Sequence, residues 1–390
     1  MKRSVIFMPI YKMDGKKDGL QKYRVRINYI DQQGKARQLD RVAYGSQAAK
    51  DLERQLNMEL TRNPTVKLTL EDLYKEYAAS KSSEVRETTL AQTKQLLNRF
   101  VVPQLGRIKL DKLTVAELQR WKNTMSGVTK NNGEPYSLVY KNNVYKAFVA
   151  LLNYGVKLEY LSNNPLHKIG PFRDANITPK KEMDFYQPEE FLKYITAAKT
   201  EAIKQEKCSN SIREWNYYIF FMIAFYTGMR KGEINALKWN DISDNVIHVT
   251  RSIAQKLKGA DRETAPKNAS SIRDIQIPKP LSTALSEHWS RCSQIDGCSR
   301  EWRICGGSKC LRDTSIDKHN RKYAELAGIK RIRIHDFRHS HASVLINEGI
   351  NIKEIARRLG HSDVEVTWST YAHLYPREEE RAVNILNKIV

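Results

Sequence analysis

Arginine, histidine and tyrosine side chains are concentrated near the C-terminal end of this 390-residue sequence. The run from Arg331 to His341 reads Arg-Ile-Arg-Ile-His-Asp-Phe-Arg-His-Ser-His, and His361 and Tyr371 follow it. Guanidinium groups match phosphate oxygens, imidazoles donate hydrogen bonds or move protons, and a phenol can act as a nucleophile. This combination of groups predicts an enzyme that acts on a phosphodiester.

Two further cations precede this run. Arg230 follows a glycine at the end of an apolar stretch, in Thr-Gly-Met-Arg-Lys-Gly-Glu, so we expect the turn and the next helix to fix its stem. Lys267 lies between two strand-like stretches, residues 246–251 and 272–277, which predicts a position at or near a hairpin tip. Both side chains would have to fold back onto the C-terminal run to reach the same phosphate.

The remaining candidates are expected on helices. His335 and Arg338 share one helical face at a spacing of three, and His361 comes just after a glycine at a predicted helix end. Taken singly, each has an ordinary explanation as a surface arginine, a structural histidine or a tyrosine at the edge of a core. Only their order and spacing favour a shared site.

The charge of the chain favours a polyanionic partner. The formal net charge is +22, from 66 Lys and Arg against 44 Asp and Glu. Such a field attracts nucleic acid through phosphate contacts and counterion release, although an acidic membrane surface or mere solubility could also account for it. No apolar run approaches the length of a membrane span, and the N-terminal apolar stretch is too short for a secretory leader. We therefore expect a cytoplasmic protein.

The cysteines do not form a recognisable metal motif. Four of the five lie within nineteen residues, but they lack the paired Cys-x-x-Cys hooks of structural zinc sites, and the odd count argues against a disulfide framework. We expect reduced structural or surface thiols. The cysteines are Cys208, Cys292, Cys298, Cys305 and Cys310.

The length predicts two or three domains, and the first is a small basic sheet. Residues 22–30 alternate strictly between apolar and polar, which predicts the central strand of a three-stranded sheet followed by a helix, over residues 1–66. Arg24 and Arg26 lie on its polar face. A basic sheet face of this kind can enter a major groove, and the alternative is a solvated face without a partner.

The rest of the chain is mainly helical. Residues 67–173 predict an all-helical domain, residues 174–184 a polar, proline-containing linker, and residues 185–390 a mixed α+β domain dominated by helices. Three lysines of the helical domain are candidate phosphate contacts: Lys130, Lys141 and Lys146.

With these motifs in place, the C-terminal half resembles the tyrosine recombinase family of the lambda integrase type. The family signature Arg…Lys…His-x-x-Arg…His…Tyr matches Arg230, Lys267, His335, Arg338, His361 and Tyr371. The resemblance covers residues 185–390 strongly and extends more weakly over 68–172, which resembles the family's core-binding domain. The first 66 residues resemble the arm-binding domains of phage and conjugative-transposon integrases.

The resemblance implies a covalent mechanism. Tyr371 would attack the scissile phosphate to give a 3′-phosphotyrosine, and a 5′-hydroxyl would leave. Arg230 and Arg338 would clamp the non-bridging oxygens, and Lys267 would be the general acid for the leaving oxygen. Tyr375 is the competing nucleophile, disfavoured by the proline and the acidic residues that follow it.

The two histidines and a glutamate complete the implied site. His335 would accept the Tyr371 proton and contact the phosphate, His361 would donate a hydrogen bond to the phosphate, and Glu233 would orient the site from behind. Neither metal nor nucleotide cofactor is implied, because the covalent intermediate conserves the bond energy for rejoining.

The implied function is site-specific integration and excision of a phage or an integrative conjugative element. The implied partners are double-stranded DNA at core and arm sites, further copies of the chain in a homotetramer, and an excisionase or a host DNA-bending protein. The C-terminal apolar stripe, residues 382–389, would pack on a neighbouring protomer, and the alternative is that it docks on its own domain. The protein would work at the nucleoid of a bacterial host. The alternatives are a chromosome-dimer resolvase, a catalytically silent DNA-binding regulator and a type IB topoisomerase.

Overall fold

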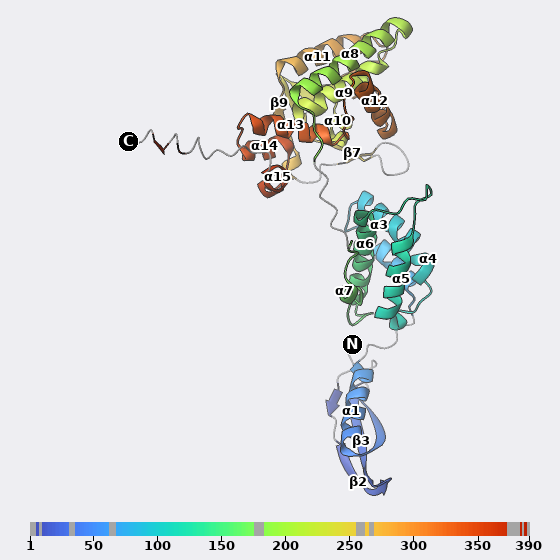
Figure 1. Cartoon of the computed structure of the whole chain (residues 1–390). Helices are drawn as coiled ribbons and strands as arrows, with labels where there is room; N and C mark the ends of the chain where they lie inside the picture. Colours follow the sequence, from blue (N-terminus) through green and yellow to red (C-terminus); the bar gives the residue numbers. More distant parts are fainter. Residues whose placement is uncertain are drawn as a thin grey trace. The chain divides into compact units, whose positions relative to one another are not determined.

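The chain forms two compact units in the computed structural model, residues 1–178 and 179–390 (Figure 1). The structure describes residues 5–7, 10–30, 36–61, 68–174, 183–254, 262–264, 269–372, 383 and 386–387. Five predicted features lie wholly or largely outside these residues: the turn at 31–34, most of the linker at 174–184, Lys267, Tyr375 and most of the C-terminal stripe. None of the described helices is both long and apolar enough to cross a membrane.

The N-terminal sheet is three strands wide, as predicted. Its elements are β1 (Val5–Phe7), β2 (Ile10–Lys17), β3 (Leu20–Ile30) and β4 (Ala36–Tyr44), followed by α1 (Ser46–Thr61). β4 pairs with one edge of β3 over nearly the whole length of β3. β1 and β2 both pair with the other edge of β3. The predicted first strand is thus two short strands that share one edge.

Alternation along β3 explains why this sheet packs on α1. Val25 and Ile27 are fully buried in a small core that also takes Leu56 from the helix. The β2–β3 hairpin closes through Asp18 and Gly19, whose φ values of 52° and 78° suit a two-residue turn of this hand. The opposite face therefore keeps its polar side chains.

Residues 68–174 are all-helical, as predicted. The helices are α2 (Leu70–Ser80), α3 (Glu87–Phe100), α4 (Val102–Leu105), η1 (Leu110–Lys112), α5 (Val115–Gly127), α6 (Leu138–Lys157) and α7 (Leu166–Ile169). Thr69 caps α2 in a capping box with Asp72, and Trp121 of α5 packs edge-on against Phe148 of α6. The apolar faces of these helices pack together and form the core of this domain.

The C-terminal unit is built around one buried helix, α9 (Arg213–Thr227), in which nearly every residue from Trp215 to Phe225 is buried. The other helices are α8 (Pro188–Ser209), α10 (Lys231–Ala236), η2 (Trp239–Asp241), η3 (Ala269–Ser271), α11 (Lys279–Cys292), α12 (Asp313–Leu326), α13 (Asp336–Asn347), α14 (Ile352–Leu359) and α15 (Val364–Tyr371). Figure 1 shows α13, α14 and α15 grouped at one end of the unit.

Two small sheets complete the unit. β5 (Ile242–Ser243), β6 (Val246–Val249) and β9 (Arg273–Gln276) form a three-stranded antiparallel sheet, and β7 (Ser252–Ala254) pairs with β8 (Arg262–Thr264). The direct pairing of β6 with β9 confirms the predicted hairpin. β7 and β8 form a second, narrower ribbon within it.

The clustered cysteines contribute to the core. Cys292 and Cys305 belong to the main hydrophobic cluster, Cys310 is buried, and Cys298 packs against the cluster. Burial raises the pKa of the Cys292 thiol to about 12 and also raises that of Cys305. Within the described part of the chain, no group of three or more His, Cys, Asp or Glu side chains could hold a metal ion.

Candidate active site

Arg230 is positioned by the turn that ends α9. Gly228 adopts a left-handed conformation with φ of 64°, and Arg230 is the N-cap residue of α10. A Cβ at Gly228 would lie 2.7 Å from side-chain atoms of both His341 and Leu359. Only glycine therefore allows the close packing of this turn on α13 and α14.

A buried carboxylate holds the Arg230 side chain. Glu233 accepts hydrogen bonds from the Arg230 backbone NH at 3.0 Å and from its Nη1 at 2.9 Å, while Arg230 Nη2 donates to the Gly360 carbonyl at 3.2 Å. Burial alone would raise the pKa of Glu233, but Arg273 and Arg230 outweigh it and lower that pKa. Glu233 is thus a fixed anion, and the predicted orienting role fits its contacts.

Arg273 is the second cation on Glu233. Its Nη2 donates to Glu233 Oε2 at 2.9 Å, and both side chains are 4% exposed. Arg273 Nε also donates to the Arg358 carbonyl at 2.8 Å. Arg273 begins β9, so this contact ties the β6–β9 sheet to both α10 and α14.

Arg358 extends the network to α13. Its Nε donates to His341 Nε2 at 3.1 Å, and His341 Nδ1 lies 2.8 Å from the Phe225 carbonyl. Burial lowers the pKa of His341 to about 3, so the ring is neutral, with its proton on Nδ1. The ring therefore links α14 to the end of α9.

Arg338 is almost completely buried. It is 3% exposed, and its Nη1 donates to the Gly228 carbonyl at 2.7 Å, two residues from Arg230. Its Nη2 is buried and has no acceptor among the described residues. Burial lowers the pKa of the guanidinium to about 9, so it remains charged at neutral pH. A buried cation with an unused donor suits an anionic ligand.

His335 and His361 both lie near this cation. His335 is the N-cap residue of α13 and is exposed as a whole residue; partial desolvation and then the charge of Arg338 lower its pKa. His361 directly follows Gly360, the left-handed cap of α14, and its Nδ1 lies 2.7 Å from Thr367 Oγ1. That contact leaves its Nε2 as the ring nitrogen that could face a phosphate.

Tyr371 is the last residue of α15 and is 1% exposed. Its ring packs against a small apolar cluster that includes Ala342, Ile346 and Leu359. Burial raises the pKa of the phenol to about 12. The hydroxyl lies 2.6 Å from Nδ1 of His339, the residue after Arg338. The structure therefore places His339 at the phenol, where the sequence had suggested His335.

Five of the six predicted catalytic residues meet at the junction of α9, α13, α14 and α15. Arg230 donates to the Gly360 carbonyl at the end of α14, and Arg338 of α13 donates to the Gly228 carbonyl at the end of α9. His361 is adjacent to Gly360, and His335 is linked through His339 to Tyr371. Lys267 lies outside the described residues, between Thr264 of β8 and Ala269 of η3.

The sequence motifs predicted no role for Arg273, Arg358 or His339. Arg273 lies in the strand-like stretch 272–277, Arg358 lies just before Gly360, and His339 lies between Arg338 and His341. The spacing of four between His335 and His339 places both rings on one side of α13, and their centroids are 5.1 Å apart. That helical spacing is the one signal that could have identified His339.

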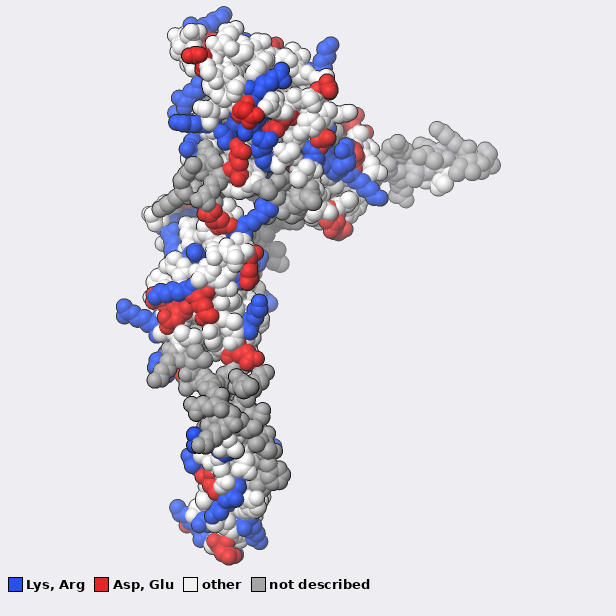
Figure 2. All heavy atoms as spheres, turned by 180° about the vertical axis from the view of Figure 1, so that it is seen from behind, with Lys and Arg blue, Asp and Glu red and all other residues white. Residues whose placement is uncertain are grey.

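The five candidate DNA contacts differ in their present partners. Arg26 makes a bidentate pair with Asp40 at 2.9 and 3.0 Å, whereas Arg24 has no such pair among the residues that the structure describes. Lys130 bonds Glu134 at 2.9 Å, Lys141 donates to the Ser126 carbonyl at 2.6 Å, and Lys146 is exposed. On the side of the chain that Figure 2 shows, basic side chains are interspersed with acidic ones.

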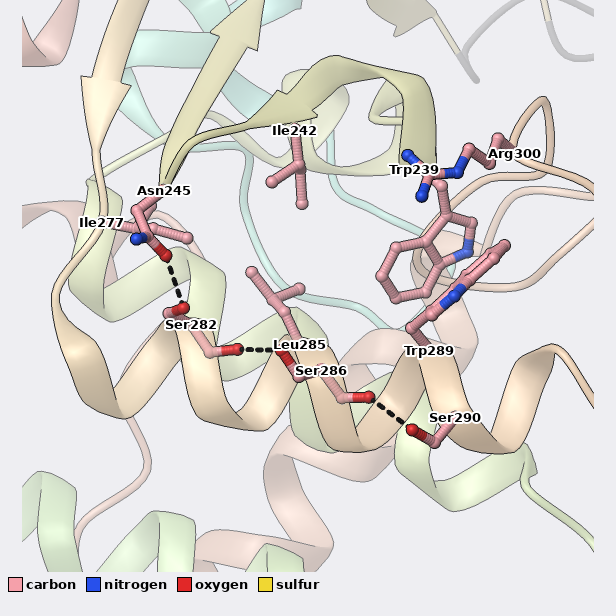
Figure 3. Close-up of a pocket in the computed structure, with 10 residues that line it drawn as sticks. All are labelled: Trp239, Ile242, Asn245, Ile277, Ser282, Leu285, Ser286, Trp289, Ser290 and Arg300. Carbon is pink, nitrogen blue, oxygen red and sulfur yellow. Dashed lines mark hydrogen bonds between the residues drawn. The ribbon is translucent and has the colours of Figure 1, made fainter.

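A separate pocket of about 340 Å³ lies beside α11 and shares no lining residue with the candidate active site (Figure 3). Trp239 and Trp289 meet at one end with ring centroids 4.9 Å apart, and Arg300 lies 5.7 Å from the Trp289 ring. Among the serines that line it, Ser282 donates to the Asn245 side chain and Ser286 donates to a backbone carbonyl of α11. The pocket holds no candidate acid, base or nucleophile.

Comparison with known protein families gives two matches. Residues 193–378 match the phage integrase family, and residues 69–126 match the N-terminal SAM-like domain of phage integrases. The ICEBs1 integrase of Bacillus subtilis strain 168 is 27% identical over 366 residues, which cover 90% of this chain and 92% of that protein. A XerC-like tyrosine recombinase of Caldanaerobacter subterraneus is 29% identical over 314 residues, covering 73% of this chain and 74% of that protein.

Solved structures show the same fold. The Tn1549 transposon integrase in complex with a circular intermediate DNA superposes with a TM-score of 0.63 at 15% identity, covering 83% of this chain and all of that one. A lambda integrase tetramer bound to a Holliday junction gives a TM-score of 0.51 at 17% identity, covering 86% and 93%. Both likenesses concern architecture.

Proposed function

Because the chain belongs to the phage integrase family and is a tyrosine-type site-specific recombinase, we propose that Tyr371 is the nucleophile with which it breaks and rejoins DNA. The recombination integrates and excises a mobile element, as the name of the similar ICEBs1 integrase suggests. The observation that carries the site assignment is the buried Arg338 guanidinium. Its Nη2 has no acceptor among the described residues, and the next residue along α13, His339, lies 2.6 Å from the buried phenol of Tyr371.

The reaction follows from the groups in this cluster. The Tyr371 oxygen attacks the scissile phosphorus, the P–O3′ linkage stays intact, and the P–O5′ bond breaks, leaving a 3′-phosphotyrosine. Charge spread over the non-bridging oxygens is stabilised by Arg230 and Arg338, which are fixed in advance by Glu233 and by the Gly228 carbonyl. His335 and His361 add hydrogen bonds to the same oxygens. Attack by a second strand's 5′-hydroxyl reverses the sequence.

Lys267 is proposed as the general acid that protonates the leaving 5′ oxygen. The described residues on either side of its segment are anchored near Arg230. Thr264 pairs with Ser252, and the Ser252 Oγ would lie 2.6 Å from a Cβ at Gly232, two residues from Arg230. Arg273, six residues beyond Lys267, bonds Glu233. The β7–β8 ribbon before the segment and β9 after it are therefore both connected to α10.

The other domains would choose the DNA. We assign residues 1–66 to arm sites and residues 67–173 to core sites, with residues 185–390 catalytic after a linker at 174–184. Arg24, Arg26, Lys130, Lys141 and Lys146 are the proposed phosphate contacts. The family match at residues 69–126 and the DNA-bound Tn1549 integrase support the middle assignment.

The working assembly is proposed to be a homotetramer on two duplexes, since a lambda integrase of the same fold forms a tetramer on a Holliday junction. The C-terminal stripe, residues 382–389, would join neighbouring protomers, and an excisionase or a host DNA-bending protein would set the direction. This DNA substrate places the reaction at the nucleoid, in the cytoplasm of a bacterial host.

Replacing the nucleophile tests the assignment directly. A nicked suicide substrate carrying the element's own attachment site traps the covalent intermediate, because the cleaved strand diffuses away. Tyr371→Phe should bind this DNA with unchanged affinity and form no covalent adduct on a denaturing gel. Tyr375→Phe is the matched control and should form the adduct. An adduct that persists in Tyr371→Phe and disappears in Tyr375→Phe would move the nucleophile to Tyr375.

A further inference from the structure

The hydroxyl of Tyr371 has one hydrogen-bond partner among the described residues, and it is His339. Nδ1 of His339 lies 2.6 Å from the phenolic oxygen, and the two rings meet at 63° with centroids 5.5 Å apart. His339 comes from the first turns of α13, and Tyr371 is the last residue of α15. Two separate helices therefore bring a base to the atom that attacks.

The direction of this hydrogen bond follows from the two pKa values. Burial, followed by the charges of His335, Arg333 and Arg338 against a smaller opposing effect of Asp336, lowers the pKa of His339 to about 4. Burial raises the pKa of Tyr371 to about 12. At neutral pH the imidazole is therefore neutral and the phenol protonated. The phenol donates, and Nδ1 accepts.

His335 is not in the same position. Its ring lies edge-on to His339, with centroids 5.1 Å apart, and it shows no hydrogen bond to Tyr371 in the described structure. As a whole residue His335 is exposed, whereas His339 is half-buried. His335 is thus placed to meet the incoming phosphate, and His339 to serve the nucleophile.

Building on the proposed function, we propose that His339 is a catalytic residue that takes the proton of Tyr371 as the phenolic oxygen attacks the phosphate. The Oη–P bond forms while the phenolic proton moves to Nδ1, and the P–O5′ bond breaks as its oxygen gains a proton from Lys267. In the rejoining step the imidazolium returns its proton to Oη, while the attacking 5′-hydroxyl gives its proton back to Lys267.

The charge of the bound phosphate makes this transfer feasible. Burial is the largest cause of the lowered pKa of His339, and the charges of Arg333 and Arg338, which lie beside or in the proposed phosphate site, add to it. A phosphate anion held by Arg338 offsets their field, so the imidazole becomes a stronger base when the substrate is in place. The free protein thus keeps its nucleophile protonated, and DNA binding makes the acceptor effective.

The test separates proton acceptance from positioning. Asn retains an amide oxygen near the position of Nδ1 but cannot take up a proton, whereas Ala removes the contact. Full-length His339→Asn and His339→Ala are measured in single-turnover cleavage of the suicide substrate. We expect losses of about 10²- to 10³-fold in both, as for removal of a general base. The matched control is His248→Asn, an exposed histidine of β6 bonded to Asp274, and it should cleave at the wild-type rate.

A pH profile supplies the readout that a structural role would not change. The substrate carries sulfur in place of the bridging 5′ oxygen, so that the leaving group needs no proton. Between pH 7 and 9 the wild-type rate should stay flat, because His339 is already unprotonated. The variants depend on preformed phenolate, so their rates should rise about tenfold per pH unit below the phenol pKa.

Three results would overturn the proposal: cleavage by His339→Ala at the wild-type rate, recovery by Asn but not Ala, or a pH-independent loss in both variants. The last two would leave His339 as a positioning residue only. These outcomes are distinct from failure of the nucleophile assignment, which Tyr371→Phe reports separately. Full DNA binding by each variant, measured on the same substrate, shows that it is folded.

Discussion

Each of the two units of this protein contains an arginine–carboxylate pair, and the two pairs have equal N–O distances. In the C-terminal unit, Arg273 bonds Glu233 at 2.9 Å with both side chains 4% exposed. In the N-terminal sheet, Arg26 bonds Asp40 at 2.9 Å with the side chains 30% and 36% exposed. Distance therefore does not distinguish them; solvent access does. A buried pair cannot exchange its partner for water, whereas an exposed pair is screened and can exchange Asp40 for a phosphate.

The buried pair acts as a scaffold because it is shared. Glu233 holds Arg273 and Arg230 at once, and Arg273 reaches on to the Arg358 carbonyl. Three segments distant in sequence, α10, β9 and α14, are thereby fixed around one carboxylate. The exposed pair joins only two neighbouring strands, β3 and β4, which their backbone ladder already holds. In the proposed site the first pair would orient Arg230, and in the proposed arm-binding face the second would keep a cation available at the surface.

Breaking the buried pair should have the largest effect. Glu233→Ala leaves Arg273 buried without its anion and frees Arg230, so we expect the free energy of unfolding to fall by roughly 3–5 kcal/mol. Urea denaturation of the full chain measures this loss. Because the pKa of Glu233 is lowered in the fold, the stabilisation is full above the ordinary carboxyl pKa and is lost as the pH falls through the lowered value.

Glu233→Gln provides the variant that should fold. It keeps the shape and one acceptor oxygen, so DNA binding should persist while single-turnover cleavage falls by 10-fold or more. Wild-type cleavage by this variant would show that the charge of Glu233 does not orient Arg230.

Removing the N-terminal module should have an intermediate effect that falls on binding alone. Deletion of residues 1–66 takes away the whole sheet with its own small core and leaves the core of residues 68–174 unchanged. Footprinting on DNA from the flanks of the element should lose protection at distant arm sites, and cleavage of the core suicide substrate should continue. Identical footprints for the full and shortened chains would refute the arm-binding assignment.

Breaking the exposed pair should have the smallest effect, and the direction of the change in DNA binding should depend on which partner is removed. Arg26→Ala should weaken arm-site binding and reduce the slope of log affinity against log salt by about 1, because one phosphate contact is lost. Asp40→Ala, the matched variant, frees Arg26 and should leave binding equal or tighter. Neither change should alter the urea midpoint measurably. Weaker binding by both variants would mean that the pair itself maintains the DNA-binding surface.

The local features of the sequence were sufficient to predict many of the helices and strands and most of the residues that meet at the candidate site. Strict alternation along residues 22–30 predicted β3 and its buried face, and the glycine before His361 predicted the end of α14. The strings around Arg230, His335, Arg338, His361 and Tyr371 identified five residues that the structure gathers at one junction. Such features depend on near neighbours in the chain, which the sequence displays directly.

The partners within the site depended on contacts between distant segments. The sequence suggested His335 for the Tyr371 proton, but the angle between α13 and α15 brings His339 to the phenol instead. It could not show that Arg273 and Arg230 share one carboxylate, because their separation of 43 positions is closed only by the β6–β9 hairpin.

The sequence by itself determined the chemistry available to this protein, since residue type fixes which groups can clamp a phosphate, attack it or move a proton. The tertiary structure decided which groups touch. Helix packing set the 2.6 Å contact between Tyr371 and His339. Arg273 and Arg230 made Glu233 a fixed anion against the effect of burial, and burial kept Tyr371 protonated. Those properties arise from solvent exclusion and from the meeting of remote segments, which exist only once the C-terminal unit has folded.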